Sequence, residues 1–218
     1  MKNKKNILMC VLLVLISIIY TLLVKYVDTS IIGPNGSVVG FSSLNSFVFN
    51  LTGNNMTLYK ITEILGIIPI LIALMYAVIG LIQVIDRKSL KVDKELIALG
   101  ILYIIVILIY VFFEKCIINY RPVLIDGILE ASYPSSHTLL SICICGSALL
   151  INKYLFNNKK IYKYINIISI ISMVLIVIGR LLSGVHWASD IIGSIIISIT
   201  LWLLFKAYSD MCASSSSS

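Results

Sequence analysis

Long apolar stretches alternate with short polar segments along most of this 218-residue chain. An α-helix needs roughly 17–25 apolar residues to cross a bilayer. Six stretches approach this length, at residues 7–24, 64–85, 96–113, 138–151, 165–179 and 191–205. The fourth and fifth are short, and we expect each to include flanking residues. The pattern predicts an all-α, polytopic integral membrane protein with six transmembrane helices in a bundle.

The composition supports this interpretation. Hydrophobic residues make up 59% of the chain and charged residues 12%, and the mean hydropathy is +1.03. A water-soluble domain of this size does not bury so much apolar surface. We expect one membrane-embedded domain over residues 1–212. The serine-rich residues 213–218 are expected to be a disordered end or an artificial addition.

The first two predicted spans each have a local feature that affects how they are interpreted. The first span follows a basic tail, as a signal peptide does, but it is long and lacks an obvious small-x-small cleavage site. We therefore expect an uncleaved anchor. The second span contains Pro69, which predicts a kink.

The basic residues predict the orientation. Twelve of the 17 lysines and arginines fall in the N-terminal tail, in the links after the second and fourth spans, and after the sixth span. Cytoplasmic segments are enriched in such residues, so both termini are expected to be cytoplasmic, in a plasma membrane. The net charge of +7 follows from this asymmetry and requires no nucleic-acid partner.

The segment between the first two spans, residues 26–63, is expected to lie outside. Turn signals occur at 33–36 and 53–55. Between them, residues 38–51 are apolar enough to form a short helix along the membrane surface.

A charged stretch precedes the last span and reads Arg-Leu-Leu-Ser-Gly-Val-His-Trp-Ala-Ser-Asp from Arg180 to Asp190. His186 and Asp190 are four residues apart, so on a helix they share one face and can form a hydrogen bond. A carboxylate on one ring nitrogen fixes the tautomer and makes the other nitrogen more basic. Ser183-Gly184 offers a turn that would bring Arg180 to the same place. The alternative is that these groups merely cap a span at the interface.

A second polar stretch lies between the third and fourth spans. It contains Lys115 and Arg121, and it ends in Pro134-Ser135-Ser136-His137, where the fourth span begins. Proline followed by serines is typical of a helix N-terminus. Free amides and the helix dipole attract an anion there.

Together these groups are suited to phosphate chemistry at the outer ends of the third to sixth helices. Several cations beside a helix N-terminus suit a phosphate, and two histidines suit a displacement in which one attacks phosphorus and the other protonates the leaving oxygen. No carboxylate cluster or cysteine spacing predicts a metal site, so we expect no cofactor.

The motifs Lys-x5-Arg-Pro, Pro-Ser-Ser-His and Gly-Arg-x5-His-x3-Asp resemble, in order, the three signatures of the type 2 phosphatidic acid phosphatase superfamily. The resemblance implies a metal-independent membrane enzyme that hydrolyses a lipid phosphate or diphosphate through a phosphohistidine. It implies that His186 is the nucleophile, that Asp190 orients it, and that His137 is the general acid. The phosphate ligands would be Lys115, Arg121, Ser135, the Ser136 amide and Arg180.

Three positions depart from the family pattern. The family has six residues between the lysine and Arg-Pro, whereas this chain has five after Lys115. Ser136 replaces a glycine, which is tolerable if only the amide is used. Gly179 stands where the family has serine, so one hydroxyl is lost.

Other functions were weighed against this one. A lipid phosphotransferase would use the same site with an acceptor other than water. A membrane transporter would carry its charges inside the spans, whereas here they lie at predicted ends and in loops. Vanadate-dependent haloperoxidases have a similar site but are soluble, and a purely structural membrane protein would not explain three ordered motifs. The substrate is expected to be undecaprenyl diphosphate, phosphatidic acid or phosphatidylglycerol phosphate.

Overall fold

The computed structural model describes the backbone of residues 2–89 and 92–215, and the side chains of residues 8–89 and 92–209. Eight α-helices, one short 3-10 helix and one two-stranded sheet form the described chain. In order they are α1 (Lys2–Tyr26), β1 (Ser30–Ile31), η1 (Pro34–Gly36), β2 (Val38–Val39), α2 (Ser42–Thr52), α3 (Met56–Leu65), α4 (Ile67–Asp86), α5 (Lys94–Lys115), α6 (Ser136–Leu155), α7 (Lys159–Leu182) and α8 (Ala188–Ser215).

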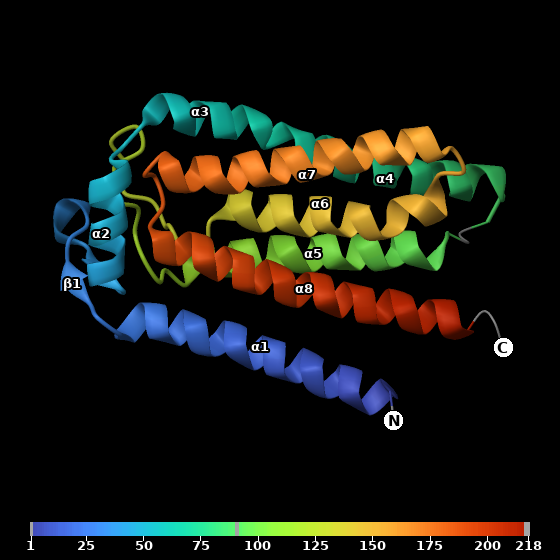
Figure 1. Ribbon diagram of the computed structural model, residues 1–218, viewed down its shortest axis with the longest axis horizontal. Coiled ribbons are helices and arrows are strands. Elements are labelled where there is room, and N and C mark those ends of the chain that lie inside the picture. The colour runs from blue at the N-terminus through green and yellow to red at the C-terminus, as the bar shows by residue number, and fades with distance from the viewer. Residues whose placement is uncertain (1, 90–91, 216–218) are drawn as a thin grey trace.

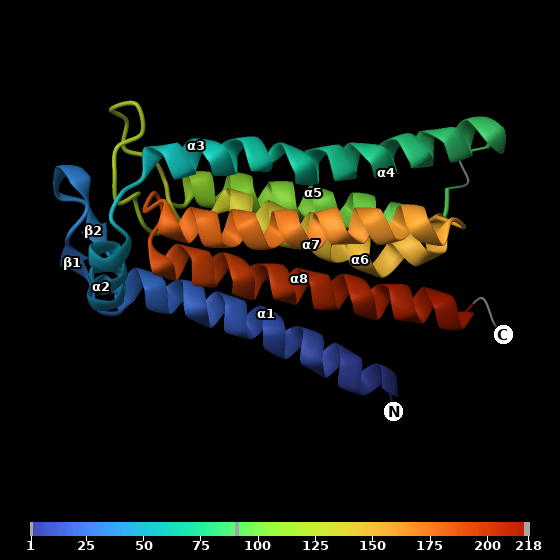
Figure 2. The ribbon, with the colours of Figure 1, turned by 45° about the horizontal axis from the view of Figure 1, so that its top comes forward.

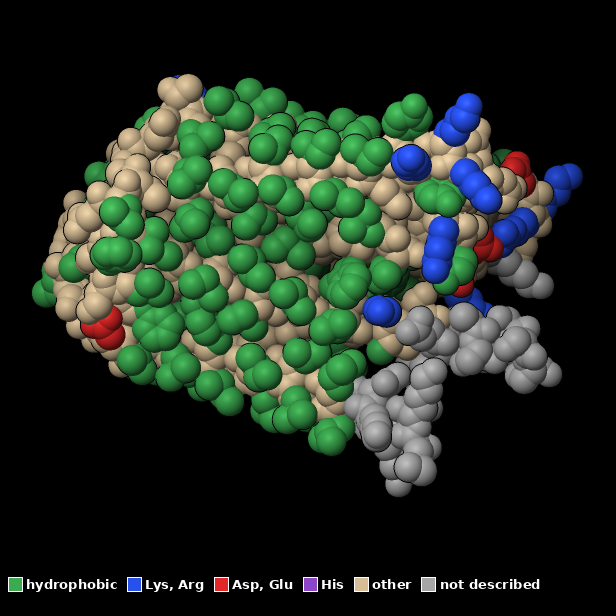
Figure 3. Space-filling view, in the orientation of Figure 1, with side chains coloured by type: hydrophobic (Ala, Val, Ile, Leu, Met, Phe, Trp, Pro, Cys, Tyr) green, Lys and Arg blue, Asp and Glu red, His purple; other side chains and the backbone are tan. Residues whose placement is uncertain are grey.

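Six membrane spans are confirmed among the described residues. They are Leu8–Tyr26, Met56–Asp86, Lys94–Lys115, Ser136–Leu155, Lys159–Leu182 and Ala188–Ser209. The helices run side by side along one long axis (Figures 1 and 2). The apolar side chains on the outside of this bundle face the space that lipid would fill (Figure 3).

Helix α6 is the centre of the bundle and packs on α4, α5, α7 and α8. Small residues on this helix let its neighbours approach closely. At Gly146 a Cβ would lie 3.0 Å from Trp202 of α8, whose indole nitrogen donates to the Gly146 carbonyl at 2.8 Å. Helices α6 and α8 are therefore the most buried spans, although their sequences are the least hydrophobic.

The second span is longer than its apolar pattern predicts and is interrupted. Helix α3 ends at Leu65, and α4 begins at Ile67 after Gly66. The interruption lies one turn before Pro69. Proline has no amide hydrogen to donate to the carbonyl four residues earlier, which is that of Leu65, and its ring crowds that carbonyl. Helix α3 thus extends the span into a segment that we expected to be an outer loop.

The segment between the first two spans caps one end of the bundle. The expected surface helix is present as α2, and residues 38–39 belong instead to β2, which pairs antiparallel with β1. Asn45 of α2 accepts a hydrogen bond from the backbone of Ser189 at 3.0 Å. The Gly40 amide donates to the Asn119 side chain at 3.1 Å. These buried bonds join the cap to the start of α8 and to the loop between α5 and α6.

The two ends of the bundle differ in charge. Lys and Arg side chains gather at the end where α1 begins and α8 ends, opposite α2 and the β1–β2 hairpin (Figure 3). Helix α8 continues to Ser215, so the first three residues of the serine-rich tail are helical. Residues 216–218 lie outside the described part of the chain, and the single-domain boundary at 212 stays a prediction.

Candidate active site

Four segments meet at the end of the bundle that carries α2. They are the α5–α6 loop, the start of α6, the end of α7 with the α7–α8 turn, and helix α3. Helix α7 ends at Leu182, and the turn then passes through Gly184, whose φ is +64°. A Cβ there would lie 1.8 Å from the Gly53 carbonyl oxygen, so only glycine fits. The expected turn at Ser183-Gly184 is present and directs His186 back over the end of α7.

His186 is held by Ser132 and not directly by Asp190. Helix α8 begins at Ala188, so His186 precedes it and does not share a helical face with Asp190. The His186 Nδ1 lies 3.0 Å from the Ser132 carbonyl oxygen and 3.1 Å from its Oγ. The Ser132 hydroxyl in turn donates to Asp190. The expected direct His186–Asp190 hydrogen bond is therefore replaced, among the described residues, by a relay through Ser132.

Asp190 is fully buried and its carboxylate has three donors. One is the Ser132 hydroxyl. The others are the Trp187 amide at 3.0 Å and the Asn119 side chain at 3.3 Å. The bond to Trp187 caps the helix. Asp190 is the third residue of α8, and its carboxylate accepts from the amide of Trp187, the residue just before the helix. Asp190 thus fixes the start of α8 and the position of Ser132 together.

The environment of His186 favours the neutral imidazole. Burial lowers the pKa of His186 well below its usual value, and the nearby charges of Arg121 and Arg180 lower it further. With Nδ1–H donating to the Ser132 carbonyl, Nε2 carries the lone pair and accepts from Arg121. Nε2 lies 3.4 Å from Nη1 of Arg121. The ring is thus a neutral imidazole whose Nε2 lies next to a cation.

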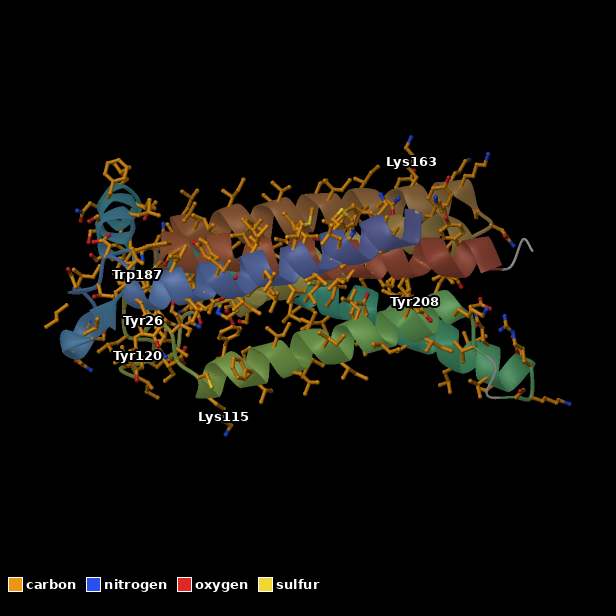
Figure 4. All side chains as sticks on the ribbon, turned by 90° about the horizontal axis from the view of Figure 1, so that it is seen from below. Tyr26, Lys115, Tyr120, Lys163, Trp187 and Tyr208 are labelled. Carbon is orange, nitrogen blue, oxygen red and sulfur yellow. The ribbon has the colours of Figure 1, made fainter. Side chains whose placement is uncertain are left out.

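Arg121 is positioned by its own loop. Its backbone amide donates to the Glu130 carbonyl at 3.0 Å, and its Nε lies 3.0 Å from the Glu130 carboxylate. Tyr120 and Ala131 form a bridge that closes the same loop. The Trp187 indole donates to the Tyr120 backbone carbonyl at 2.7 Å, and both residues lie at the end of the bundle that carries α2 (Figure 4). The loop is thereby fixed to the α7–α8 turn.

Arg180 is completely buried at the end of α7. One guanidinium nitrogen forms an ion pair with Glu63 of α3, and the guanidinium lies 4.9 Å from the centre of the Tyr59 ring. Its Nε and Nη1, like the buried Ser135 hydroxyl, have no hydrogen-bond partner within the described residues. Buried donors left unpaired are costly and mark a place for an acceptor. Together with the free amides at the start of α6, they suit a phosphoryl group.

His137 lies in the first turn of α6 and is partly exposed. Its Nε2 is 3.4 Å from the Glu63 carboxylate. A Cβ at Gly66 would lie 2.7 Å from the His137 ring, so the break between α3 and α4 brings backbone against the imidazole. Thus the structure brings His137, Arg180 and His186 to one end of the bundle with Arg121, Ser135 and Asp190.

Lys115 is not part of this group. It is the last residue of α5, its side chain is exposed, and it points away from the bundle (Figure 4). No hydrogen bond or ion pair joins it to another site residue in the described part of the chain. The five-residue spacing before Arg121 leaves the lysine on the outer side of α5. Its expected role in phosphate binding therefore lacks support from the geometry.

The sequence did not identify three polar residues that complete the site: Glu63, Asn119 and Ser132. Only Glu63 left a signal, since it is a lone carboxylate at the outer boundary of an apolar span. Asn119 and Ser132 lie in an irregular loop, where spacing does not predict contacts. Within the described residues, no group of three or more His, Cys, Asp or Glu side chains is arranged to hold a metal ion.

The fold is that of a membrane phosphatase of known structure. A structural match with a TM-score of 0.58 covers 93% of this chain and 96% of the other, at 20% identity. The matched protein is a transmembrane PAP2-type phosphatidylglycerolphosphate phosphatase from Bacillus subtilis, seen in a crystal structure. A search of curated proteins found no match.

The family is given by a second comparison. The model of the PAP2 superfamily matches residues 96–213, which is more than half of the chain and includes all three motifs. The chain therefore belongs to the PAP2 superfamily, and it is a multi-pass membrane protein with the fold of a membrane PAP2 phosphatase.

Proposed function

We propose that this protein hydrolyses a phosphate or diphosphate ester of a membrane lipid, through a phosphohistidine formed on His186. The observation that carries the proposal is the position of His186 Nε2, which lies beside the Arg121 guanidinium and near the charge of buried Arg180. The Arg180 Nε and Nη1 have no hydrogen-bond partner among the described residues. A nucleophile beside empty cationic donors is suited to a phosphoryl group. Family membership supports a phosphatase.

In the first step His186 Nε2 attacks phosphorus, and the bond from phosphorus to the leaving oxygen breaks. Arg121, Arg180, Ser135 and the first amides of α6 stabilise the charge on the phosphoryl oxygens. His137 supplies a proton to the leaving oxygen, because an alkoxide is a poor leaving group. The Ser132 relay lets Asp190 stabilise the positive charge that develops on His186.

In the second step water attacks the phosphohistidine. His137, now neutral, takes a proton from the water, the phosphorus–nitrogen bond breaks, and inorganic phosphate leaves. The side chains described above account for both steps. An acceptor alcohol in place of water would make the protein a phosphotransferase, so the two activities differ only in the second step.

The membrane position supports a lipid substrate. The proposed site lies at the end of six spans whose outward side chains are apolar, so a substrate anchored in the bilayer can bring its head group to this level. The opposite end carries most of the basic side chains (Figure 3). By the positive-inside rule that end is cytoplasmic in the plasma membrane, and the site faces outward. The matched protein is a phosphatidylglycerolphosphate phosphatase, so this lipid joins undecaprenyl diphosphate and phosphatidic acid as substrates to test.

The experiment is phosphate release by the purified protein in detergent with a metal chelator, on these three lipids. We expect release from at least one lipid, lost in His186→Ala. Formation of a phosphorylated alcohol without free phosphate would identify a transferase instead. If the protein turned over none of the phosphorylated lipids, that result would contradict the proposal.

A further inference from the structure

Glu63 is a charged residue in the candidate site to which none of the three motifs assigns a role. It comes from α3, far in sequence from the α5–α8 segment that carries them. Its carboxylate contacts Arg180 of α7 and lies 3.4 Å from the His137 Nε2 on α6. One carboxylate therefore joins a proposed phosphate ligand to the proposed general acid.

Without Glu63, the surroundings of His137 would oppose a proton on its ring. The ring lies in the first turn of α6, where the helix dipole disfavours a cation. The charged or titratable groups facing it from the neighbouring elements are Arg180 on α7, Arg121 in the α5–α6 loop, His186 in the α7–α8 turn and Glu63 on α3. Glu63 is the one negative group among these four.

We propose that Glu63 is a positioning residue that favours the protonated form of His137, from which the ring donates to the leaving oxygen. This inference rests on the proposed function, in which His137 is the general acid. Arg180 fixes the carboxylate through the ion pair, so the negative charge stays beside the imidazole. The Nε and Nη1 of Arg180, which have no partner among the described residues, are left to donate to the phosphoryl oxygens.

The contact geometry is compatible with donation. The 3.4 Å separation is an ion-pair distance, and it exceeds the usual 2.7–3.2 Å of an N–H···O hydrogen bond. The carboxylate therefore attracts the Nε2–H without forming a short hydrogen bond to it, and the proton can still be donated to another oxygen. When the bond from phosphorus to the leaving oxygen breaks, the proton passes from His137 to that oxygen. The attacking water later returns a proton to the ring, and Glu63 itself transfers none.

The test is the pH profile of kcat/KM for phosphatidic acid in detergent micelles with a chelator. In Glu63→Gln the alkaline limb should move to lower pH by about one unit, since one opposite charge at this distance stabilises an imidazolium by about that much. Above that limb, the lipid rate should fall about tenfold. The rate on p-nitrophenyl phosphate, whose leaving group departs without protonation, should change by less than about threefold.

Glu130→Gln is the matched control. Glu130 has the same 41% side-chain exposure as Glu63 and also pairs with a site arginine, Arg121, but the ion pairs among the described residues do not join it to His137. Its alkaline limb should stay at the wild-type position. Glu63→Asp keeps the charge near Arg180 and withdraws it from His137. It should move the limb in the same direction by a smaller amount, and it provides the test if Glu63→Gln does not fold.

Two results would overturn the inference while leaving the proposed function intact. One is an alkaline limb that stays in place in both Glu63 variants. The other is an equal loss of rate on both substrates, which would mean that Glu63 only positions Arg180. If the wild-type protein released no phosphate from any lipid, the proposed function would fail, and this inference with it.

Discussion

The Nδ1 of His186 lies 3.0 Å from the carbonyl oxygen of Ser132, a residue 54 positions earlier in the chain. This contact decides which ring nitrogen carries the lone pair, because a neutral ring that donates through Nδ1 has its lone pair on Nε2. It also places the Ser132 hydroxyl between the imidazole and the Asp190 carboxylate.

Replacing Ser132 by alanine should therefore weaken catalysis without abolishing it. The carbonyl contact remains, and only the hydroxyl link to Asp190 is lost. A hydrogen bond to a charged group contributes about 1.5–3 kcal/mol, so kcat should fall by roughly 10- to 100-fold. The measurement is steady-state phosphate release. Ser172→Ala is the control. It removes a buried serine hydroxyl whose partners are Cys145 and the Ser169 carbonyl, which are not site residues, and it should retain activity. Equal activity in both variants would argue against the relay.

Replacing each of the two histidines is expected to impair a different step of the reaction. His186→Ala should form no phosphoenzyme, even from an activated ester, because the attacking nitrogen is gone. His137→Ala should lose most activity on a lipid phosphate and far less on p-nitrophenyl phosphate. Acid quenching with labelled substrate measures the trapped phosphohistidine in each variant. If His186→Ala still traps label on histidine while His137→Ala does not, the two roles are reversed.

Lys115→Ala should keep activity close to that of the wild type, because the side chain is exposed and points away from the site. In contrast, Arg180→Ala should lose activity by about two to three orders of magnitude, as expected when a transition-state contact of about 2–4 kcal/mol is removed. Rates of phosphate release on the same lipid compare the two. A large loss in Lys115→Ala would show that α5 brings this lysine to the substrate in the working enzyme.

Restoring the family's serine at Gly179 should destabilise this protein. A Cβ at position 179 would lie 2.4 Å from the Thr62 Cγ2 on α3, so either Thr62 must rotate and lose its bond to the Tyr59 carbonyl, or α3 and α7 must separate. Overpacking of this kind costs about 1–3 kcal/mol. Thermal unfolding in detergent should show a lower midpoint for Gly179→Ser. The double variant Gly179→Ser, Thr62→Ala should recover most of the lost unfolding midpoint. A double variant as unstable as Gly179→Ser alone would refute the steric explanation.

The proposed orientation predicts which loops are accessible from outside the cell. In a background without native cysteines, Asp126→Cys lies at the exposed tip of the α5–α6 loop, and Asn157→Cys lies in the α6–α7 link at the other end. A membrane-impermeant thiol reagent should label Cys at 126 in intact cells, and Cys at 157 only after lysis. The reverse pattern would mean that the candidate site faces the cytoplasm.

The sequence alone determined the membrane architecture, because the length and hydropathy of a span are local properties. It predicted six spans, the turn at Ser183-Gly184 and the helix start after Pro134, and these agree with the structure. It also contained the three ordered motifs, since a motif is a matter of residue identity and spacing. The break near Pro69 followed from the missing amide of proline, although its position at Gly66 did not.

Only the tertiary structure decided which side chains meet. His186 and Asp190 are four apart, and spacing predicted a helical pair, but α8 begins two residues after His186, and Ser132 stands between them. Glu63 reaches His137 because the extended α3 packs against α7. Lys115 leaves the site because α5 ends with that side chain turned outward. Contacts between distant segments depend on helix ends and loop paths, which are set by packing across the bundle and not by the periodicity of any one segment.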